Sequence, residues 1–256
     1  LGIPVPTGKD SLSMTQKYKE GTEVNAPGTV IISAAAETDN FLNYISPDLK
    51  PILESAILYV NLSGIKECPL GGSALSQTLG ELGSEVPKVK DLNKFAKGFS
   101  LIQKLLREEK ILAGHDVSSG GVISALCEMA FAGDLGIRIS INEVSDPASF
   151  LFCEKPAVIL QVFENQKTQL IKLFKESELD VMEIARVQGS PFVELEAGAL
   201  SFNKPLAELR RAWFQPSALF DAMQTKNKKA DERFNNFDKH PLKFKFPKDF
   251  TGAAKD

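Results

Sequence analysis

The sequence predicts an α/β or α+β domain in which helices pack on a mixed sheet. Two observations support this fold class: apolar, β-branched segments alternate with amphipathic segments along most of the chain, and a hairpin pattern follows at 192–202. Of the 256 residues, 43% are hydrophobic and 25% are charged, which is typical of a globular protein. This length suits one large domain, or one domain and part of another.

The expected strands are short apolar or alternating segments at 29–36, 56–62, 136–141, 157–162, 181–187, 192–196 and 199–202. The expected helices lie at about 73–82, 91–110, 120–133, 165–177 and 206–214, with a helical turn at 149–154 and another helix from 216 to 225. In the 91–110 helix, the predicted apolar stripe consists of Leu92, Phe95, Phe99, Ile102 and Leu106. The strand at 29–36 is expected to be buried.

The two ends of the chain differ in character from its centre. Pro47 and Pro51 indicate a crossing between two units at 41–55, so the strand at 29–36 is expected to belong to a preceding domain that is mostly missing. The opening Leu-Gly-Ile-Pro-Val-Pro is typical of the middle of a longer protein. After Lys226, phenylalanines at 237, 244, 246 and 250 follow a charged run without a regular period, which predicts an extended strap lying on another surface.

Charge and cysteine content exclude several classes of protein. The net charge of −3 gives no reason to expect nucleic acid or an anionic membrane as a partner. Cys68, Cys127 and Cys153 lack metal-type spacing, and the last two are expected to be small core residues. An odd, scattered set of cysteines fits a reducing cytoplasm, and there is no membrane-spanning run or signal peptide.

The stretch from 114 to 133 combines a polar turn with a helix start. Ser118 or Ser119 can cap the helix, and Gly120 and Gly121 leave the N–H groups of its first turn uncovered. Free N–H groups and the helix dipole favour an anion such as phosphate. Asp116 would repel a bare phosphate, but it becomes useful when Mg²⁺ lies between the two. The stretch therefore indicates a magnesium–nucleotide corner, with a capped core helix as the alternative.

Two other glycine-containing turns have weaker signals. Lys9, Asp10 and Ser11 form a turn that suits phosphate or another anion, although it is not a Walker A loop; the alternative is an exposed turn with a solvated lysine. Gly71 and Gly72 precede a serine-capped helix and repeat the pattern at 118–121. The simpler interpretation of these glycines is a tight turn that lets helix and strand pack closely.

Several motifs in one order carry a specific resemblance to a known family. They are Gly-Lys-Asp-Ser-Leu-Ser-Met at 8–14, Gly-Gly-Ser-Ala-Leu at 71–75, His-Asp-Val-Ser-Ser-Gly-Gly at 115–121, Glu-Met-Ala-Phe-Ala-Gly at 128–133, and Leu209-Arg210 with Trp213. This set resembles the large, single-chain phosphoribosylformylglycinamidine (FGAM) synthases of purine biosynthesis. The resemblance covers nearly the whole chain.

The resemblance implies a division of the chain into three parts. That family is built from paired modules like those of aminoimidazole ribonucleotide (AIR) synthetase, each with a barrel-forming N-type half and an α/β C-type half, followed by a glutaminase domain. Residues 1–45 then correspond to the end of the second N-type half, 46–225 to the second C-type half, and 226–256 to a connector towards the glutaminase domain. The remaining domains of the family, including the glutaminase domain, become expected partners.

The resemblance also implies a reaction and residue roles. The family uses ATP to activate the formyl amide oxygen of formylglycinamide ribonucleotide (FGAR), and ammonia from glutamine displaces phosphate. It implies Mg²⁺ and ATP or ADP as cofactors, Asp116 as a magnesium ligand and Ser118 as a nucleotide contact. The family often has an acid where this chain has Ser119. Its matching aspartate is best associated with a nucleotide that holds the fold, so no catalytic residue is expected here. The alternative to a segment of such a synthase is a non-catalytic Mg-nucleotide-binding or scaffold module.

Overall fold

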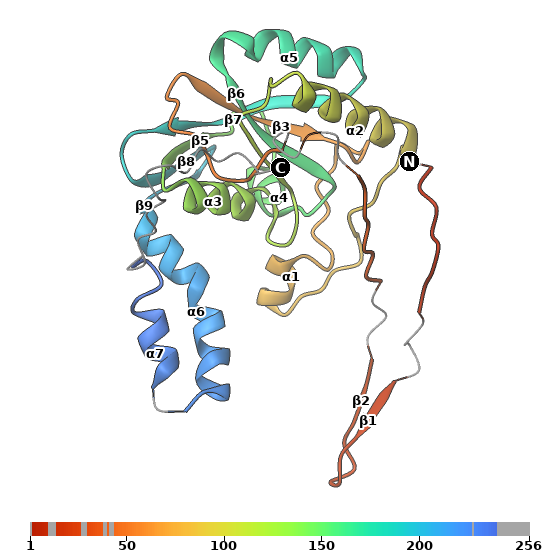
Figure 1. The fold of residues 1–256 in the computed structure, drawn as a ribbon, viewed down its shortest axis with the longest axis vertical. Coiled ribbons are helices and arrows are strands. Elements are labelled where there is room, and N and C mark those ends of the chain that lie inside the picture. The colour runs from red at the N-terminus through yellow and green to blue at the C-terminus, as the bar shows by residue number, and fades with distance from the viewer. Residues whose placement is uncertain are drawn as a thin grey trace, which may run out of the picture. The chain divides into compact units, whose positions relative to one another are not determined.

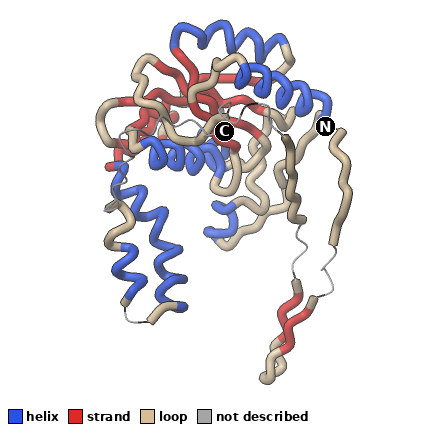
Figure 2. The backbone as a smooth tube through the Cα atoms, viewed as in Figure 1, coloured by secondary structure: helices blue, strands red, loops and turns tan. Residues whose placement is uncertain are grey.

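The computed structural model describes residues 2–9, 14–26, 30–37, 40, 44–226 and 228–239. The chain divides into two compact units, Leu1–Tyr44 and Ile45–Asp256. The larger unit is a seven-stranded sheet with helices on both faces (Figure 1). Figure 2 shows the same backbone with its helices, strands and loops distinguished. No helix among the described residues is long and apolar enough to cross a membrane.

The smaller unit contains a two-stranded antiparallel ladder, β1 (Thr15–Lys17) with β2 (Glu23–Asn25). The buried strand expected at 29–36 is a wrong prediction over its described residues, 30–36. They have no regular secondary structure, and Val30, Ile31 and Ile32 are 85%, 87% and 84% exposed. β-Branched side chains favour a strand, but a strand also needs a neighbour for its hydrogen bonds. Within the described part of this unit, only β1 and β2 pair.

The sheet of the larger unit has the strand order β4-β6-β3-β7-β5-β8-β9. Its strands are β3 (Ser55–Asn61), β4 (Ala113–Asp116), β5 (Gly136–Ser140), β6 (Ala157–Phe163), β7 (Asp180–Gln188), β8 (Phe192–Ala197) and β9 (Leu200–Pro205). Neighbours are antiparallel except β5 and β8, which are parallel. The predicted mixed sheet, its late hairpin and the strands expected after residue 55 are therefore confirmed within a few residues.

The helices are α1 (Ala74–Leu79), α2 (Leu92–Arg107), α3 (Gly121–Gly133), α4 (Pro147–Phe152), α5 (Glu164–Glu176), α6 (Leu206–Gln224) and α7 (Lys229–Phe234). Successive side chains of β3 point to opposite faces of the sheet and so belong to two separate cores. Ala56, Leu58 and Val60 face the core beneath α2 and α5, whereas Ile57 and Tyr59 face the core beneath α3 and α4. Figure 1 shows these two helical layers on opposite sides of the sheet.

Helix α2 is where predicted, with Asp91 as its N-cap, but its predicted apolar stripe is partly wrong. Leu92 and Phe99 are 74% and 42% exposed. Ile102 is buried as predicted, but the other buried residues of α2 are Gly98 and Leu105, which lie outside the predicted stripe. A Cβ on Gly98 would lie 2.6 Å from a side-chain carbon of Leu62, so the missing side chain lets the helix approach the sheet at that point. A pattern of large apolar residues gives no weight to glycine and therefore missed Gly98.

Helix α6 corrects the prediction of two helices at 206–214 and 216–225, because a single helix continues through Pro216. A proline inside a helix removes one backbone hydrogen bond. Contacts beyond the helix compensate for this loss: Phe214 stacks on Phe237 with ring centroids 4.3 Å apart, and Trp213 contacts Phe131 edge to face at 6.3 Å. Contacts between residues distant in sequence therefore override the local signal of the proline.

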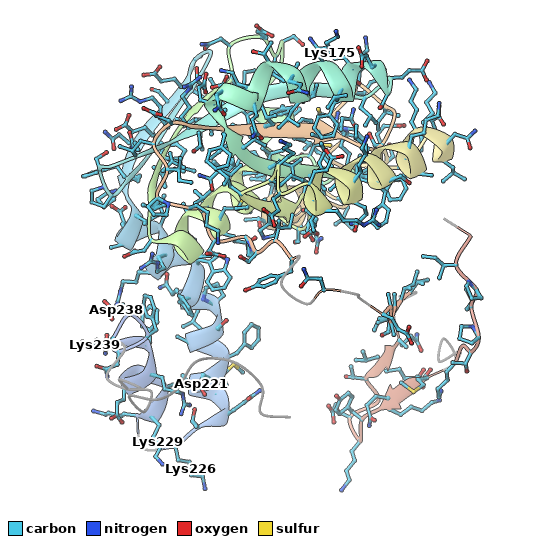
Figure 3. The ribbon with its side chains drawn as sticks, turned by 45° about the horizontal axis from the view of Figure 1, so that its top comes forward. Lys175, Asp221, Lys226, Lys229, Asp238 and Lys239 are labelled. Carbon is cyan, nitrogen blue, oxygen red and sulfur yellow. The ribbon has the colours of Figure 1, made fainter. Side chains whose placement is uncertain are left out.

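The extended strap expected after Lys226 is wrong for residues 229–234, which form helix α7 beside α6. Arg233 Nε donates to Asp221 of α6 at 2.7 Å, and the Arg211 guanidinium lies 4.2 Å from the centre of the Phe234 ring. Figure 3 labels Asp221 on this helical pair. The phenylalanines at 244, 246 and 250 lie outside the described residues.

Candidate functional site

The predicted magnesium–nucleotide corner lies at the end of edge strand β4. β4 pairs antiparallel with β6, and the next amide, Val117 N–H, donates to Ala157 O at 2.9 Å. Val117 is buried, whereas Asp116 and Ser118 on either side of it are exposed. The Asp116 side chain is 75% exposed. The strand therefore presents a carboxylate and a hydroxyl to solvent immediately before α3 begins.

The start of α3 differs from the prediction in one respect. Gly120 is the N-cap, with φ +86°, and no side chain caps the helix, so the expected caps Ser118 and Ser119 are wrong. The reason is that Gly120 and Gly121 both adopt positive φ and turn the chain tightly. Gly121 N–H donates to Ser118 O at 3.0 Å. That turn uses the serine backbone and leaves both serine side chains exposed.

Glu154, which no sequence motif indicated, holds this corner together. Its Oε1 accepts from Gly120 N–H and from Ala74 N–H, each at 2.8 Å. One carboxylate therefore joins the first turns of α1 and α3. The N–H groups predicted to be uncovered are thus engaged at both Gly120 and Gly121. Charge-assisted bonds of this kind, from backbone N–H to a carboxylate, are stronger than neutral ones.

The glycines before α1 behave as their simpler interpretation predicts. Gly72 has φ +74°, and a Cβ on Gly71 would lie 2.4 Å from Glu85 O. Ser73 caps the helix, with its Oγ accepting from Ser76 N–H at 3.2 Å. This turn is therefore explained by close packing and capping.

A polar network connects α6 to β4 and α3. His115 Nδ1 lies 2.7 Å from Asp116 O, and His115 Nε2 lies 3.2 Å from Glu128 Oε2. Trp213 Nε1 donates to the other Glu128 oxygen at 3.0 Å. Nearby, Arg210 donates to Asp134 at 2.6 Å. The motif residues outside the turn therefore hold β4, α3 and α6 in one arrangement.

The donor set limits what kind of metal site this can be. Within the described ranges, no three His, Cys, Asp or Glu side chains are grouped so that they could hold a metal ion. Asp116 therefore stands as a single exposed carboxylate. This fits Mg²⁺, which proteins commonly hold through one or two carboxylates together with phosphate oxygens and water, but not a metal that needs several protein ligands.

We expect Glu154→Ala to lower the free energy of unfolding by about 1–3 kcal/mol, because it leaves two backbone N–H groups without their acceptor. Glu154→Gln keeps an acceptor oxygen and should cost less. Urea unfolding of both variants measures the difference, with exposed Glu81→Ala as the matched control near α1. A cost for Glu154→Ala no larger than that of the control would contradict the bridging role.

Residues 57–198, more than half of the chain, match the model of the AIR synthase related protein, C-terminal domain. The chain belongs to this family. Its match includes the β4–α3 corner, Glu154 and most of the sheet. The predicted fold class is thereby confirmed for the C-type domain, while the barrel expected before it is not shown.

Relatives of this AIR synthase related domain confirm the resemblance seen in the motifs. The phosphoribosylformylglycinamidine synthase of Homo sapiens is 36% identical over 231 residues, which cover 88% of this chain and 17% of that protein. A probable phosphoribosylformylglycinamidine synthase of Caenorhabditis elegans is 34% identical over 231 residues, covering 83% and 17%. The chain thus spans only about a sixth of the length of these relatives.

Solved structures share the fold of the AIR synthase related domain at low sequence identity. T. maritima PurL complexed with ATP has a TM-score of 0.52 and 14% identity, covering 66% of this chain and 27% of that one. T. maritima PurL complexed with FGAR has a TM-score of 0.53 and 16% identity, covering 66% and 30%. These likenesses support the architecture of the sheet and its helices.

The other predicted site residues lie in the N-terminal unit. Lys9 is exposed, and Asp10 and Ser11 lie outside the described residues. The suggested phosphate loop formed by these three residues therefore stays a prediction. In the AIR synthase related domain itself, a cavity of about 700 Å³ is lined by Tyr59, Cys68 and Lys155 among others, and no local sequence pattern indicates it.

Proposed function

We propose that the chain is a segment of a phosphoribosylformylglycinamidine synthase. The whole enzyme would convert FGAR, glutamine and ATP into FGAM, glutamate, ADP and phosphate. The observation that carries this proposal is the 36% identity to the human synthase across 88% of the chain. The matched family model and the shared fold also support it. FGAR and the other domains of the same polypeptide, including a glutaminase domain, are the proposed partners.

Within that enzyme, the β4–α3 corner would bind Mg²⁺ and ATP or ADP. Asp116 would hold the ion, which shields the carboxylate from the phosphate charge when bound. Ser118 would donate from its exposed hydroxyl, and the Gly120–Gly121 turn would place the positive end of α3 beside the phosphate. Because Gly120 N–H already donates to Glu154, phosphate would bind through Ser118 and the helix dipole, or else displace the Glu154 carboxylate.

We further propose that this nucleotide holds the fold and that the chain supplies no catalytic group. Glu154 supports this role, because it links the corner to α1 through structural hydrogen bonds. A ligand at this point would stabilise the native state by linkage. The alternative to a synthase segment is a non-catalytic Mg-nucleotide-binding or scaffold module.

The domain boundaries are also part of the proposal. Residues 1–45 would end an N-type half, 46–225 would form the C-type half, and 226–256 would lead towards the glutaminase domain. The change of unit between Tyr44 and Ile45 supports the first boundary. A cytoplasmic location is supported by three free cysteines.

We expect the purified 256-residue chain to form no FGAM from FGAR, glutamine and Mg·ATP, while the full-length protein that contains it does. Catalysis needs the reacting groups positioned together, and this segment spans 17% of its relatives. The measurement is FGAM formation with each protein, using heat-treated full-length protein as the blank. A full-length protein without this activity would overturn the proposed function, and an active 256-residue chain would overturn its non-catalytic role.

A further inference from the structure

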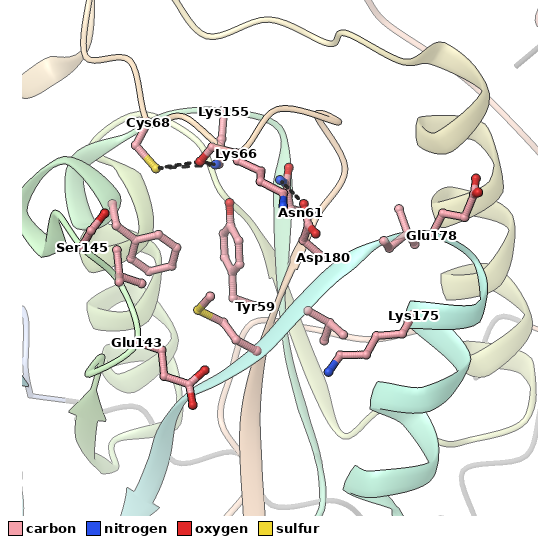
Figure 4. A pocket seen from close by; sticks show the side chains of 15 residues that line it. Tyr59, Asn61, Lys66, Cys68, Glu143, Ser145, Lys155, Lys175, Glu178 and Asp180 are labelled. Atoms are coloured by element: carbon pink, nitrogen blue, oxygen red, sulfur yellow. Dashed lines mark hydrogen bonds between the residues drawn. The ribbon is translucent and has the colours of Figure 1, made fainter.

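The cavity at one end of the sheet contains reactive side chains that the proposed function does not use. Tyr59, from β3, and Lys155, just before β6, line it together with Cys68 from the loop after β3 (Figure 4). Its volume of about 700 Å³ admits small molecules. Cys68 is half-buried, so its sulfur borders this space while resting against protein.

Lys155 fixes a positive charge beside the Cys68 sulfur. Its side chain is buried, and Nζ donates to the carbonyl oxygens of Ile65, Lys66 and Glu67 at 3.3, 3.1 and 3.1 Å. The same Nζ lies 3.5 Å from Cys68 Sγ. The loop after β3 therefore surrounds the Lys155 ammonium with carbonyl oxygens and places the Cys68 sulfur beside it. A lysine held in this way favours the thiolate form of a neighbouring cysteine.

The second thiol is Cys153, the C-cap of α4, which is 1% exposed. Its thiol acts as a hydrogen-bond donor in setting the pKa of Cys68. That bond, followed by the charge of Lys155, lowers the pKa of Cys68 to about 6. The bond to Cys68 and burial both raise the pKa of Cys153, so Cys153 stays the protonated partner. The two thiols therefore differ in how readily they ionise.

The hydroxyl of Tyr59 faces the same group. It is buried and has no hydrogen-bond partner among the described residues. Burial raises the pKa of Tyr59, so the hydroxyl remains a neutral donor. An unpaired donor in a cavity beside a thiolate can hold an oxygen atom of an incoming molecule or of an oxidised sulfur.

We propose that Cys68 is a site of reversible oxidation by hydrogen peroxide, with Cys153 as the resolving thiol that closes a Cys68–Cys153 disulfide. The Cys68 thiolate attacks one peroxide oxygen, forming an S–O bond and breaking the O–O bond, and the departing hydroxide takes a proton to become water. Cys153 then loses its proton and attacks the Cys68 sulfenic acid; the S–S bond forms, the S–O bond breaks, and the second water leaves. Two thiols are oxidised by two electrons and one peroxide is reduced.

The position of the pair gives the oxidation a structural consequence. Glu154 lies between Cys153 and Lys155 in the sequence, and its carboxylate holds the first turns of α1 and α3. A disulfide requires a much shorter sulfur–sulfur distance than a hydrogen bond between thiols. We expect the closing of this bond to shift Cys153, which is next to Glu154 in the sequence. The thiol pair is linked in this way to the β4–α3 corner.

The test is peroxide treatment of the purified protein, followed by non-reducing peptide mass spectrometry. We expect the peptides of Cys68 and Cys153 to become linked and to separate again with dithiothreitol. Cys153→Ser should instead accumulate a Cys68 sulfenic acid that dimedone labels. Cys127→Ser is the matched control and should form the link as wild type does. Absence of the link in wild type, or oxidation of Cys127 at the same peroxide concentration as Cys68, would overturn the proposal.

The pH dependence of alkylation provides an independent readout. Only the thiolate reacts, so alkylation of Cys68 by iodoacetamide should be fast above a midpoint near pH 6 and slow below it. Cys127, whose pKa burial raises to about 12, should stay unreactive across neutral pH. Lys155→Met should move the Cys68 midpoint upward; if that variant does not fold, the wild-type profile decides by itself. A Cys68 midpoint near the ordinary value of about 8.5 would count against the site.

Discussion

Asp116→Asn in the full-length enzyme is expected to lower retention of Mg·ADP by at least about tenfold, the scale on which metal sites respond to altered ligand surroundings. The substitution keeps the size of the side chain and removes the charge that a magnesium ion requires. Because the Asp116 side chain is 75% exposed, little packing is lost. Stability without nucleotide should therefore change by no more than about 0.5 kcal/mol.

The measurement is the amount of ADP released from denatured wild-type and variant protein, together with the melting temperature with and without added Mg·ADP. Linkage predicts that wild type gains stability from Mg·ADP and that the variant gains much less. Asp231→Asn, an exposed change on α7, is the matched control and should retain nucleotide as wild type does. Equal nucleotide content and equal melting shifts for Asp116→Asn and wild type would leave Asp116 as an ordinary exposed residue of the turn.

Local sequence predicts most helices and strands of the larger unit, because apolar periodicity, capping residues and turn spacing are all visible within the element itself. β3 alternates between two cores, α2 begins at a capping aspartate, and the hairpin of β8 and β9 closes as its spacing predicts. The failures concern residues whose partners are distant. Gly98 faces the sheet because Leu62 packs where its side chain would be, and Pro216 stays inside α6 because aromatic contacts hold that helix on both sides. The strand expected at 29–36 has favourable composition but no pairing partner among the described residues.

In the candidate site, too, local features can be predicted from the sequence, whereas contacts between distant residues cannot. Asp116 and Ser118 are exposed on either side of buried Val117, and their roles as magnesium ligand and nucleotide contact stay predictions. The carboxylate that engages the adjoining N–H group comes from Glu154, which is 34 residues from Gly120 and 80 from Ala74. Likewise, Lys155 meets Cys68 from 87 residues away. One sequence without an alignment carries no signal for such pairs, because their side chains follow no local period.

Gly121→Ala is expected to lower the free energy of unfolding by more than any other single methyl group added in the corner. Gly121 has φ +74°, where an L-residue costs about 1–2 kcal/mol. The added Cβ would also lie 2.6 Å from Leu151 O and from the carbonyl carbon of Phe152. Those atoms belong to the backbone of α4 and cannot rotate away, so overpacking should add about 1–3 kcal/mol.

Gly72→Ala separates the cost of the positive φ from the cost of overpacking against α4. Gly72 also has φ +74°, but a Cβ there would meet nothing within 4 Å, so only the backbone term of about 1–2 kcal/mol applies. Chemical unfolding of both variants beside wild type measures the difference. If only Gly121→Ala is insoluble, that result also shows that it is the more destabilising of the two substitutions. Moving α4 away from α3 also draws Glu154, two residues after α4, from Gly120, so Gly121→Ala should reduce Mg·ADP retention in the full-length enzyme as well. Equal costs for the two substitutions would show that the approach of α4 to Gly121 does not constrain the corner, and its geometry would then depend on the backbone conformation of the glycines alone.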